Sequence, residues 1–262
     1  MRTALFVTCI NDVLYPGTGQ AAVKLLRRLG VEVEFPMAQS CCGQMHCNTG
    51  YRADTAKLAR HFVKVLGDYD RIIMPSASCG QAPREFYMKA AEATGDSKLA
   101  LDTQRILPKI REITEFITDD LGIHDTGAYF PHRVAYHPTC HSLRIQRIGE
   151  RPLMLLRAVR GIDLVELPNA TECCGFGGTF SVKNGAVSGA MNGDKAQHVR
   201  ESGADVLTAV DNSCLMNIGG RLAKDRTAVR SMHLIEILAR TQADGPIGPM
   251  PGVPVVAAGV AS

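Results

Sequence analysis

Short apolar runs alternate along the chain with longer amphipathic stretches. The apolar runs predict buried strands, and apolar side chains repeated every three or four positions predict helices. Strands are expected at residues 5–8, 31–35, 71–75, 134–137, 162–167 and 206–210. Helices are expected at residues 20–29, 52–66, 110–121, 151–159, 185–202 and 233–240. This alternation predicts an α/β fold with mostly parallel sheets flanked by crossover helices.

The same pattern occurs twice. The segment Val33-Glu34-Phe35-Pro36 precedes Cys41-Cys42-Gly43, and Val165-Glu166-Leu167-Pro168 precedes Cys173-Cys174-Gly175. In both copies the proline stands five positions before the first cysteine of the pair. Such self-similarity predicts an internal duplication of two similar Rossmann-like α/β half-domains. We expect the first at residues 1–122 and the second at 132–240, joined by a short linker, with a Pro- and Gly-rich disordered tail at 241–262.

Eight of the nine cysteines fall on the repeat. The first set is Cys9, Cys41, Cys42 and Cys79, and the second is Cys140, Cys173, Cys174 and Cys214. The first two cysteines are 32 residues apart in one set and 33 in the other. Each cysteine follows an expected strand, and the carboxyl ends of parallel strands meet at one edge of a sheet. The pattern therefore predicts that the four thiols of each half converge there.

Four converging thiolates suit either a closed zinc site or an iron–sulfur cluster. Adjacent cysteines fit one zinc ion poorly, because their β-carbons point apart in extended backbone, whereas neighbouring thiolates can reach different irons of a cluster. The glycine after each pair lets the backbone approach the metal group. The sequence thus favours iron–sulfur over zinc without excluding zinc.

Three further residues, one cysteine and two histidines, carry less information. Cys47 lies outside the repeat, since its counterpart is Thr179, and we interpret it as a spare thiol. His137 and His141 flank Cys140. A lone histidine is usually a surface or core residue, although His141 could hydrogen-bond a cluster sulfur or move a proton.

Composition excludes several other classes. The net charge is only +3, Lys and Arg are dispersed, Trp is absent and aromatics make up 5%, which argues against a nucleic-acid groove. No apolar run reaches the length of a membrane span. The start of the chain lacks the pattern of a signal peptide, and the many cysteines then indicate metal or redox chemistry in the cytoplasm.

At these cysteines the chain resembles the cysteine-rich "CCG" domain proteins, and within them the lactate-utilisation protein A type. The resemblance rests on four stretches: residues 6–9, 41–44, 173–180 and 214–222. It implies that the eight repeated cysteines are cluster ligands, with one [4Fe-4S] cluster in each half. It also implies an iron–sulfur, electron-transport subunit of an oxidoreductase that oxidises L-lactate to pyruvate. Its partners would be a ferredoxin-like iron–sulfur subunit and a third lactate-utilisation subunit.

One departure from the family pattern affects the cluster type. In the heterodisulfide reductase branch each half ends in Cys-x-x-Cys and supplies five thiolates, but here the fifth positions are Ala82 and Asn217. The chain is therefore expected to hold ordinary four-ligand clusters. Three alternatives remain: a non-redox zinc scaffold, a thiol–disulfide enzyme that uses Cys41 and Cys42, and a family subunit that serves glycolate or glycerol-3-phosphate oxidation.

Overall fold

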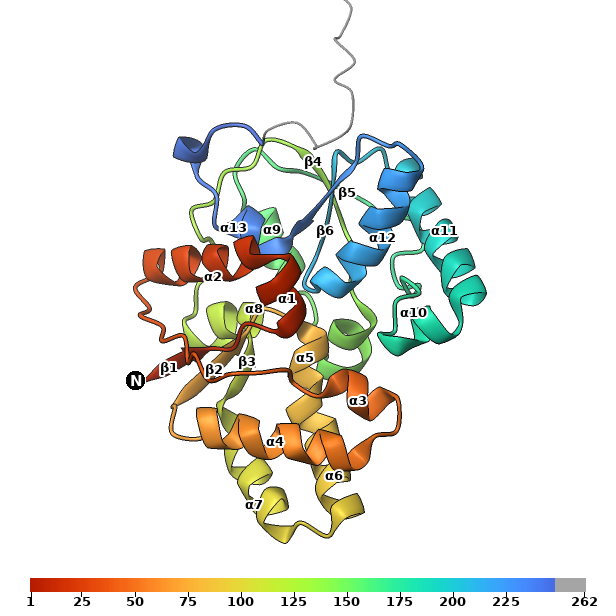
Figure 1. Ribbon diagram of the computed structural model, residues 1–262. Helices are drawn as coiled ribbons and strands as arrows, with labels where there is room; N and C mark the ends of the chain where they lie inside the picture. The colour runs from red at the N-terminus through yellow and green to blue at the C-terminus, as the bar shows by residue number, and fades with distance from the viewer. Residues whose placement is uncertain (248–262) are drawn as a thin grey trace, which may run out of the picture.

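The structure is a computed structural model that describes residues 1–247, and it contains two parallel β-sheets, one from each half of the sequence (Figure 1). The first sheet has the order β1–β2–β3, formed by Thr3–Leu5, Arg71–Met74 and Ile110–Glu112. The second has the order β5–β4–β6–β7, formed by Asp163–Val165, Arg133–Tyr136, Val206–Ala209 and Arg230–His233. All pairings between these strands are parallel, so the predicted α/β class and the duplication are confirmed.

Helices connect the strands in both halves, and the first half has more of them. The first half has α1 (Cys9–Leu14), α2 (Pro16–Arg28), α3 (Gln44–Asn48), α4 (Arg52–Leu66), α5 (Ala77–Gln81), α6 (Tyr87–Thr94), α7 (Ser97–Ile106) and α8 (Ile113–Glu115). The second half has the π-helix η4 (His141–Gln146), α9 (Arg151–Arg157), α10 (Thr179–Lys183), α11 (Gly185–Glu201), α12 (Asn212–Lys224) and α13 (Leu234–Leu238). Short helices η1 (Ala82–Phe86), η2 (Leu107–Lys109) and η3 (Phe116–Asp120) complete the first half.

Some expected elements differ from the structure. The helix expected at 110–121 begins as strand β3 and becomes helical only at Ile113, because Glu112 forms a capping box that starts α8. The strand expected at 5–8 lies earlier, as β1, and strand β7 was not predicted, whereas the helix expected at 233–240 is present as α13. The strand expected at 31–35 is reduced to a single bridge between Glu34 and Ala4.

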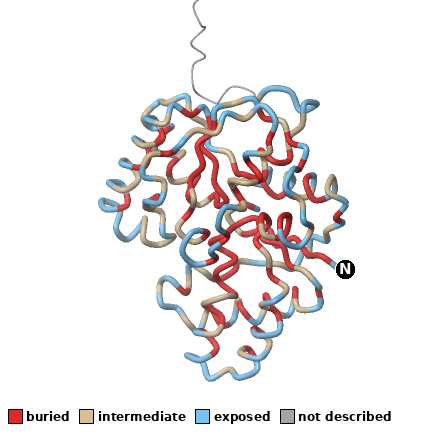
Figure 2. The backbone as a smooth tube through the Cα atoms, turned by 180° about the vertical axis from the view of Figure 1, so that it is seen from behind, coloured by how far each residue is buried: buried red, intermediate tan, exposed pale blue. Residues whose placement is uncertain are grey.

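The two sheets lie on opposite sides of one shared core. Side chains alternate along each strand, so Leu5 and Ile73 face the shared core while Ala4 and Ile72 face a separate core under α4, α6 and α7. In the second sheet Val206 faces the shared core and Leu207 faces a third core under α11 and α12. Figure 2 shows the buried backbone concentrated in both sheets and between them. The halves are thus joined by apolar packing as well as by the linker.

Helices of the two halves pack against each other in the shared layer. Helix α2 of the first half packs against α13 of the second, and α9 of the second packs against α8 of the first. The helices at the cysteine ends behave in the same way, since α1 contacts α12 and α5 contacts η4. This reciprocal packing brings the carboxyl ends of the two sheets toward each other.

The expected tail begins with ordered structure. A 3-10 helix η5 (Gln242–Asp244) carries a capping box between Thr241 and Asp244, and Asp244 forms an ion pair with Lys24. Ile247 packs against the shared core. The rest of the expected tail, residues 248–262, lies outside the described residues. No helix within residues 1–247 is long and apolar enough to cross a bilayer.

Candidate metal centres

Both cysteine sets line the same cavity. Cys9 and Cys79 lie in the short helices α1 and α5 that follow β1 and β2, while the adjacent pair precedes α3. The second half repeats this arrangement before η4, before α10 and in α12. All eight thiols lie on the wall of one cavity of about 90 Å³, which both halves contribute to. The sequence predicted each convergence but not that the two sets share a cavity.

The first set is held by backbone contacts around Gly43. The sulfurs of Cys9 and Cys41 are 3.8 Å apart. The Gly43 N–H lies 3.4 Å from the Cys41 sulfur, toward which it donates, and its φ of +86° gives the left-handed turn that makes this contact. The Tyr87 hydroxyl donates to the Cys42 carbonyl at 3.0 Å, which fixes the second cysteine of the pair.

The second set repeats this geometry. The Gly175 N–H donates toward the Cys173 sulfur at 3.4 Å, and Gly175 has φ +82°. The Cys174 and Cys214 sulfurs are 3.0 Å apart. Here the Asn217 side chain replaces the tyrosine, since its Nδ2 donates to the Cys174 carbonyl at 2.8 Å. The residue in the fifth-ligand position of the second half therefore has a structural contact.

The thiols of each set strongly perturb one another. Hydrogen bonds from Cys42 and Cys9 lower the pKa of Cys41 to about 2, and those from Cys140 and Cys174 lower the pKa of Cys173 to about 2. The same contacts, with burial, raise the pKa of the donating thiols: Cys9, Cys42, Cys140 and Cys174. One thiolate is therefore favoured in each set at the expense of its neighbours. Full deprotonation of four such sulfurs requires a bound cation.

The donor sets fit a metal group. Each supplies four sulfurs on a partly buried cavity wall, with a backbone N–H directed at one of them. Soft thiolates are the ligands of iron–sulfur clusters and of zinc. Cys42, Cys79, Cys174 and Cys214 are buried, while Cys9, Cys41, Cys140 and Cys173 are half-buried.

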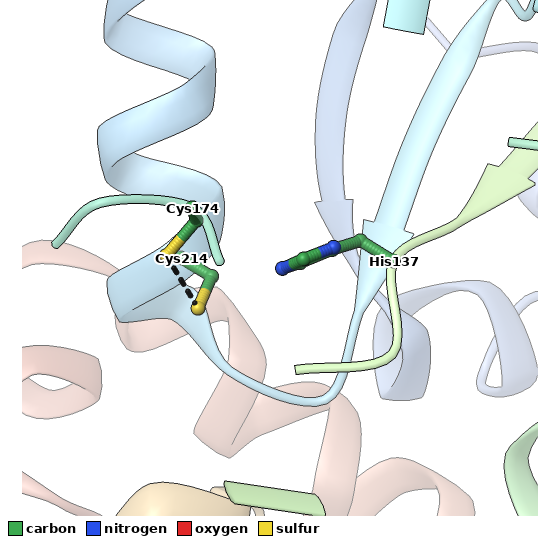
Figure 3. Close-up of side chains that lie close together, drawn as sticks. All are labelled: His137, Cys174 and Cys214. Atoms are coloured by element: carbon green, nitrogen blue, oxygen red, sulfur yellow. Dashed lines mark hydrogen bonds between the residues drawn. The ribbon is translucent and has the colours of Figure 1, made fainter. Parts of the chain in front are cut away.

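A histidine joins the second set only. The imidazole of His137 and the sulfurs of Cys174 and Cys214 place their ligand atoms within 4.8 Å of one another. Figure 3 shows the His137 ring, from the end of β4, extending toward the two sulfurs. Burial is the main cause that lowers the pKa of His137 to about 4, and Lys195 lowers it further. Sequence reasoning set His137 aside as a flanking residue, although its place in the β4 alternation was a usable signal.

Known proteins match this arrangement. The family model of the cysteine-rich domain, CCG, matches residues 3–82 and 134–219, and each stretch contains one set of four cysteines. The chain belongs to the cysteine-rich domain family. It is 42% identical to the lactate utilization protein A of Geobacillus thermodenitrificans (strain NG80-2), over 91% of this chain and 98% of that protein. It is 44% identical to the protein of the same name from Exiguobacterium sp. (strain ATCC BAA-1283 / AT1b), over 90% of this chain and 96% of that one.

A solved structure supports the fold of this pair of cysteine-rich domains. The crystal structure of a hypothetical protein from Helicobacter pylori superposes with a TM-score of 0.63 at 13% identity. The match covers 94% of this chain and 49% of that one, so this chain spans about half the length of the solved protein.

Of the two other residues considered from the sequence, His141 lines the shared cavity and Cys47 does not. His141 lines the shared cavity and accepts a hydrogen bond at its Nε2 from the Gln44 side-chain amide at 2.8 Å, which links the two domains. Within residues 1–247, Cys47 is the only cysteine outside the cavity wall, and it is buried beside Arg52, whose guanidinium donates to its sulfur. This placement agrees with Cys47 as a spare thiol.

A buried carboxylate ties the cysteine-bearing loops together across the domain boundary. Asp211 is 1% exposed and stands directly before the first residue of α12. Its oxygens accept from the Ser76 hydroxyl at 2.7 Å, the Ser78 hydroxyl at 2.8 Å, the Ser78 N–H at 3.1 Å and the Thr139 hydroxyl at 3.0 Å. Because Ser78 precedes Cys79 and Thr139 precedes Cys140, one side chain orients loops from both cysteine sets.

Proposed function

We propose that this chain is an iron–sulfur subunit of a complex that oxidises L-lactate to pyruvate, and that it relays electrons within that complex. The observation that carries the proposal is the pair of equivalent four-thiol sets on one cavity wall. The relatives named lactate utilization protein A, which this chain matches almost end to end, support lactate as the substrate of the complex. The proposed complex lies in the cytoplasm. Its other members would be a ferredoxin-like iron–sulfur subunit and a third lactate-utilisation subunit.

The eight repeated cysteines would hold one [4Fe-4S] cluster in each half. Such a cluster, when bound, stores and releases single electrons at a potential set by its surroundings. The chain contributes the rest of the site. The N–H groups of Gly43 and Gly175 stabilise negative charge on Cys41 and Cys173, and hydrogen bonds to the carbonyls of Cys42 and Cys174 fix both pairs. Burial of Cys42, Cys79, Cys174 and Cys214 limits the access of water to half of the sulfurs.

A zinc scaffold is the second candidate, and a specific observation favours it. A histidine that converges with cysteines, as His137 does with Cys174 and Cys214, is also a common zinc donor set. Metal content separates the two candidates, because a scaffold would hold zinc and no sulfide.

The first experiment is anaerobic purification of the full chain, with assays of iron, acid-labile sulfide and zinc in one sample. We expect a brown protein with about eight irons and about eight sulfides per chain, as two four-iron clusters require. A colourless protein that keeps stoichiometric zinc after iron–sulfur reconstitution would refute the electron-relay function.

The matched variants Cys41→Ser and Cys173→Ser then assign iron to each half. Each is expected to lose about half of the bound iron, because each removes a thiolate from one set only. Unchanged iron in both variants would contradict the two-cluster arrangement. For the substrate, deletion of the gene in a host without another lactate dehydrogenase should abolish growth on L-lactate, and intact growth would refute that part of the proposal.

A further inference from the structure

The two sites differ at one position of the duplication. Phe6 stands three residues before Cys9, and His137 stands three residues before Cys140. Strand alternation directs both side chains away from the shared core. Phe6 lies in the core under α4, α6 and α7, together with Cys42 and Cys79. It packs edge-on against Phe62, at 5.0 Å between ring centroids. At this position the first site therefore has an apolar ring, which offers no metal ligand.

In the second half, His137 takes that place without a polar partner of its own. Its side chain is fully buried, and among residues 1–247 neither ring nitrogen makes a hydrogen bond of good geometry, although the Ala170 carbonyl lies near the ring. A carbonyl can accept only the ring N–H, so the lone pair of the other nitrogen has no donor, and an unpaired buried polar group indicates a missing ion or ligand. The ring extends toward the sulfurs of Cys174 and Cys214 (Figure 3), which are themselves metal donors.

Lys195 does not provide the missing partner. Its ammonium group, carried by α11, donates to the Asn169 carbonyl at 2.5 Å and to the Ala170 carbonyl at 3.5 Å. As a cation it has no lone pair to accept a proton from the ring. Its charge lies on the side of the second cysteine set, where it favours bound anionic sulfur. The second half therefore adds a nitrogen donor and a buried cation.

We propose that His137 is a nitrogen ligand of the metal group held by Cys140, Cys173, Cys174 and Cys214. The second site then has five donors, four sulfurs and one nitrogen, so one metal atom there would carry two protein donors, and the first site has four sulfurs only. The neutral imidazole donates a lone pair to the metal, and no electron transfer or leaving group is involved. This inference rests on the proposed function, because it concerns the metal group of the second cysteine set.

The test uses the full-length, iron-loaded protein labelled with ¹⁵N-histidine and reduced with dithionite, or with europium(II) where dithionite is too weak. Pulsed EPR then measures the ¹⁵N hyperfine coupling to the reduced cluster. We expect a strong coupling in the wild type, because a metal–nitrogen bond transmits spin density to the ring. The coupling should survive Cys41→Ser, which removes the first site, and disappear in Cys173→Ser.

The decisive variant is His137→Phe, which copies the residue that the first half carries at this position. We expect it to retain about the wild-type iron content, since the four thiolates remain, and to lose the coupling. The control is His141→Asn, because His141 also lines the cavity but is paired with Gln44, and the coupling should remain. The proposal is overturned if the iron-loaded wild type shows no strong coupling, a result that does not depend on how any variant folds. It is equally overturned if His137→Phe keeps the coupling.

The histidine ligand and the iron–sulfur function can fail separately. If the purified protein contains zinc and no iron, the proposed function is refuted by the metal assay. The ligand is then tested in cobalt(II)-substituted protein carrying the same ¹⁵N label. A coupling present in the wild type and absent in His137→Phe supports the ligand, and no coupling in the wild type overturns it.

Discussion

Replacing the buried Asp211 by asparagine tests how firmly the two halves are joined at the cysteine loops. The wild-type carboxylate accepts hydrogen bonds from two serines of the first half and from Thr139 of the second. A hydrogen bond to a charged acceptor is worth about 1.5–3 kcal/mol, against about 0.5–1.5 kcal/mol for a neutral one. Asparagine keeps the shape of the side chain but loses its charge. Its NH₂ group replaces one carboxylate oxygen and cannot accept the hydrogen bonds that this oxygen received.

The expected loss in unfolding free energy is about 3 kcal/mol. In a chain of this size each kcal/mol shifts the melting temperature by about 2–4 °C, so Asp211→Asn should melt roughly 6–12 °C lower. Far-UV circular dichroism is the suitable assay because the chain has no tryptophan. Asp194→Asn, an exposed residue on α11, is the control and should melt like the wild type. If Asp211→Asn melts within about 1 °C of the wild type, the reasoning about this carboxylate is wrong.

Three further predictions follow from buried or constrained positions. Burial raises the pKa of Glu112 to about 8 from 4.5, so between these values the folded state keeps a proton that the unfolded state loses. The free energy of unfolding should therefore fall by roughly 4 kcal/mol as pH rises from about 5 to about 8. Melting temperatures measured across this range should show the decline in the wild type and not in Glu112→Gln. A β-carbon at Gly175 would lie 2.7 Å from the Ser188 carbonyl oxygen, so Gly175→Ala should lose iron from the second site. Gly43→Ala meets no such contact and carries only the positive-φ strain of about 1–2 kcal/mol, so it should keep its iron. Equal iron content in the two variants would contradict this difference. Cys47→Ser should bind as much iron as the wild type, and a loss of about half would show that this thiol is a ligand after all.

The sequence predicted most of the regular structure because its long elements carry clear periodicity. Helix α4 has the expected limits, and the alternation of strands and helices is recognisable in each half. The edge strands β3 and β7 were missed for a physical reason. Each has only three or four residues, contains charged or polar side chains, and runs directly into a helix, so the apolar spacing continues across the junction. Their identity comes from pairing with β2 and β6, which is a long-range contact.

The site was predictable to the extent that it depends on local spacing. The duplicated cysteines and the rule that ligands gather at strand ends were sufficient to place four thiols together in each half. The shared cavity depends on contacts between the two halves, such as α1 with α12 and α5 with η4, which no local pattern encodes. His137 was within reach, because the alternation of β4 puts it on the same side as Ala135, facing the third core with Cys174 and Cys214. The absence of a hydrogen-bond partner could be seen only in three dimensions.

The packing of helices across the shared core has a consequence for the history of the chain. The shared face of each sheet is buried only when both halves are present, because α2 packs against α13 and α9 against α8. An ancestor with a single half per polypeptide would bury these faces, and bring eight thiols to one cavity, as a symmetric homodimer. Fusion of two such copies would remove the requirement for identical subunits and let each copy change alone. The phenylalanine of one half and the histidine of the other mark a place where that symmetry was broken.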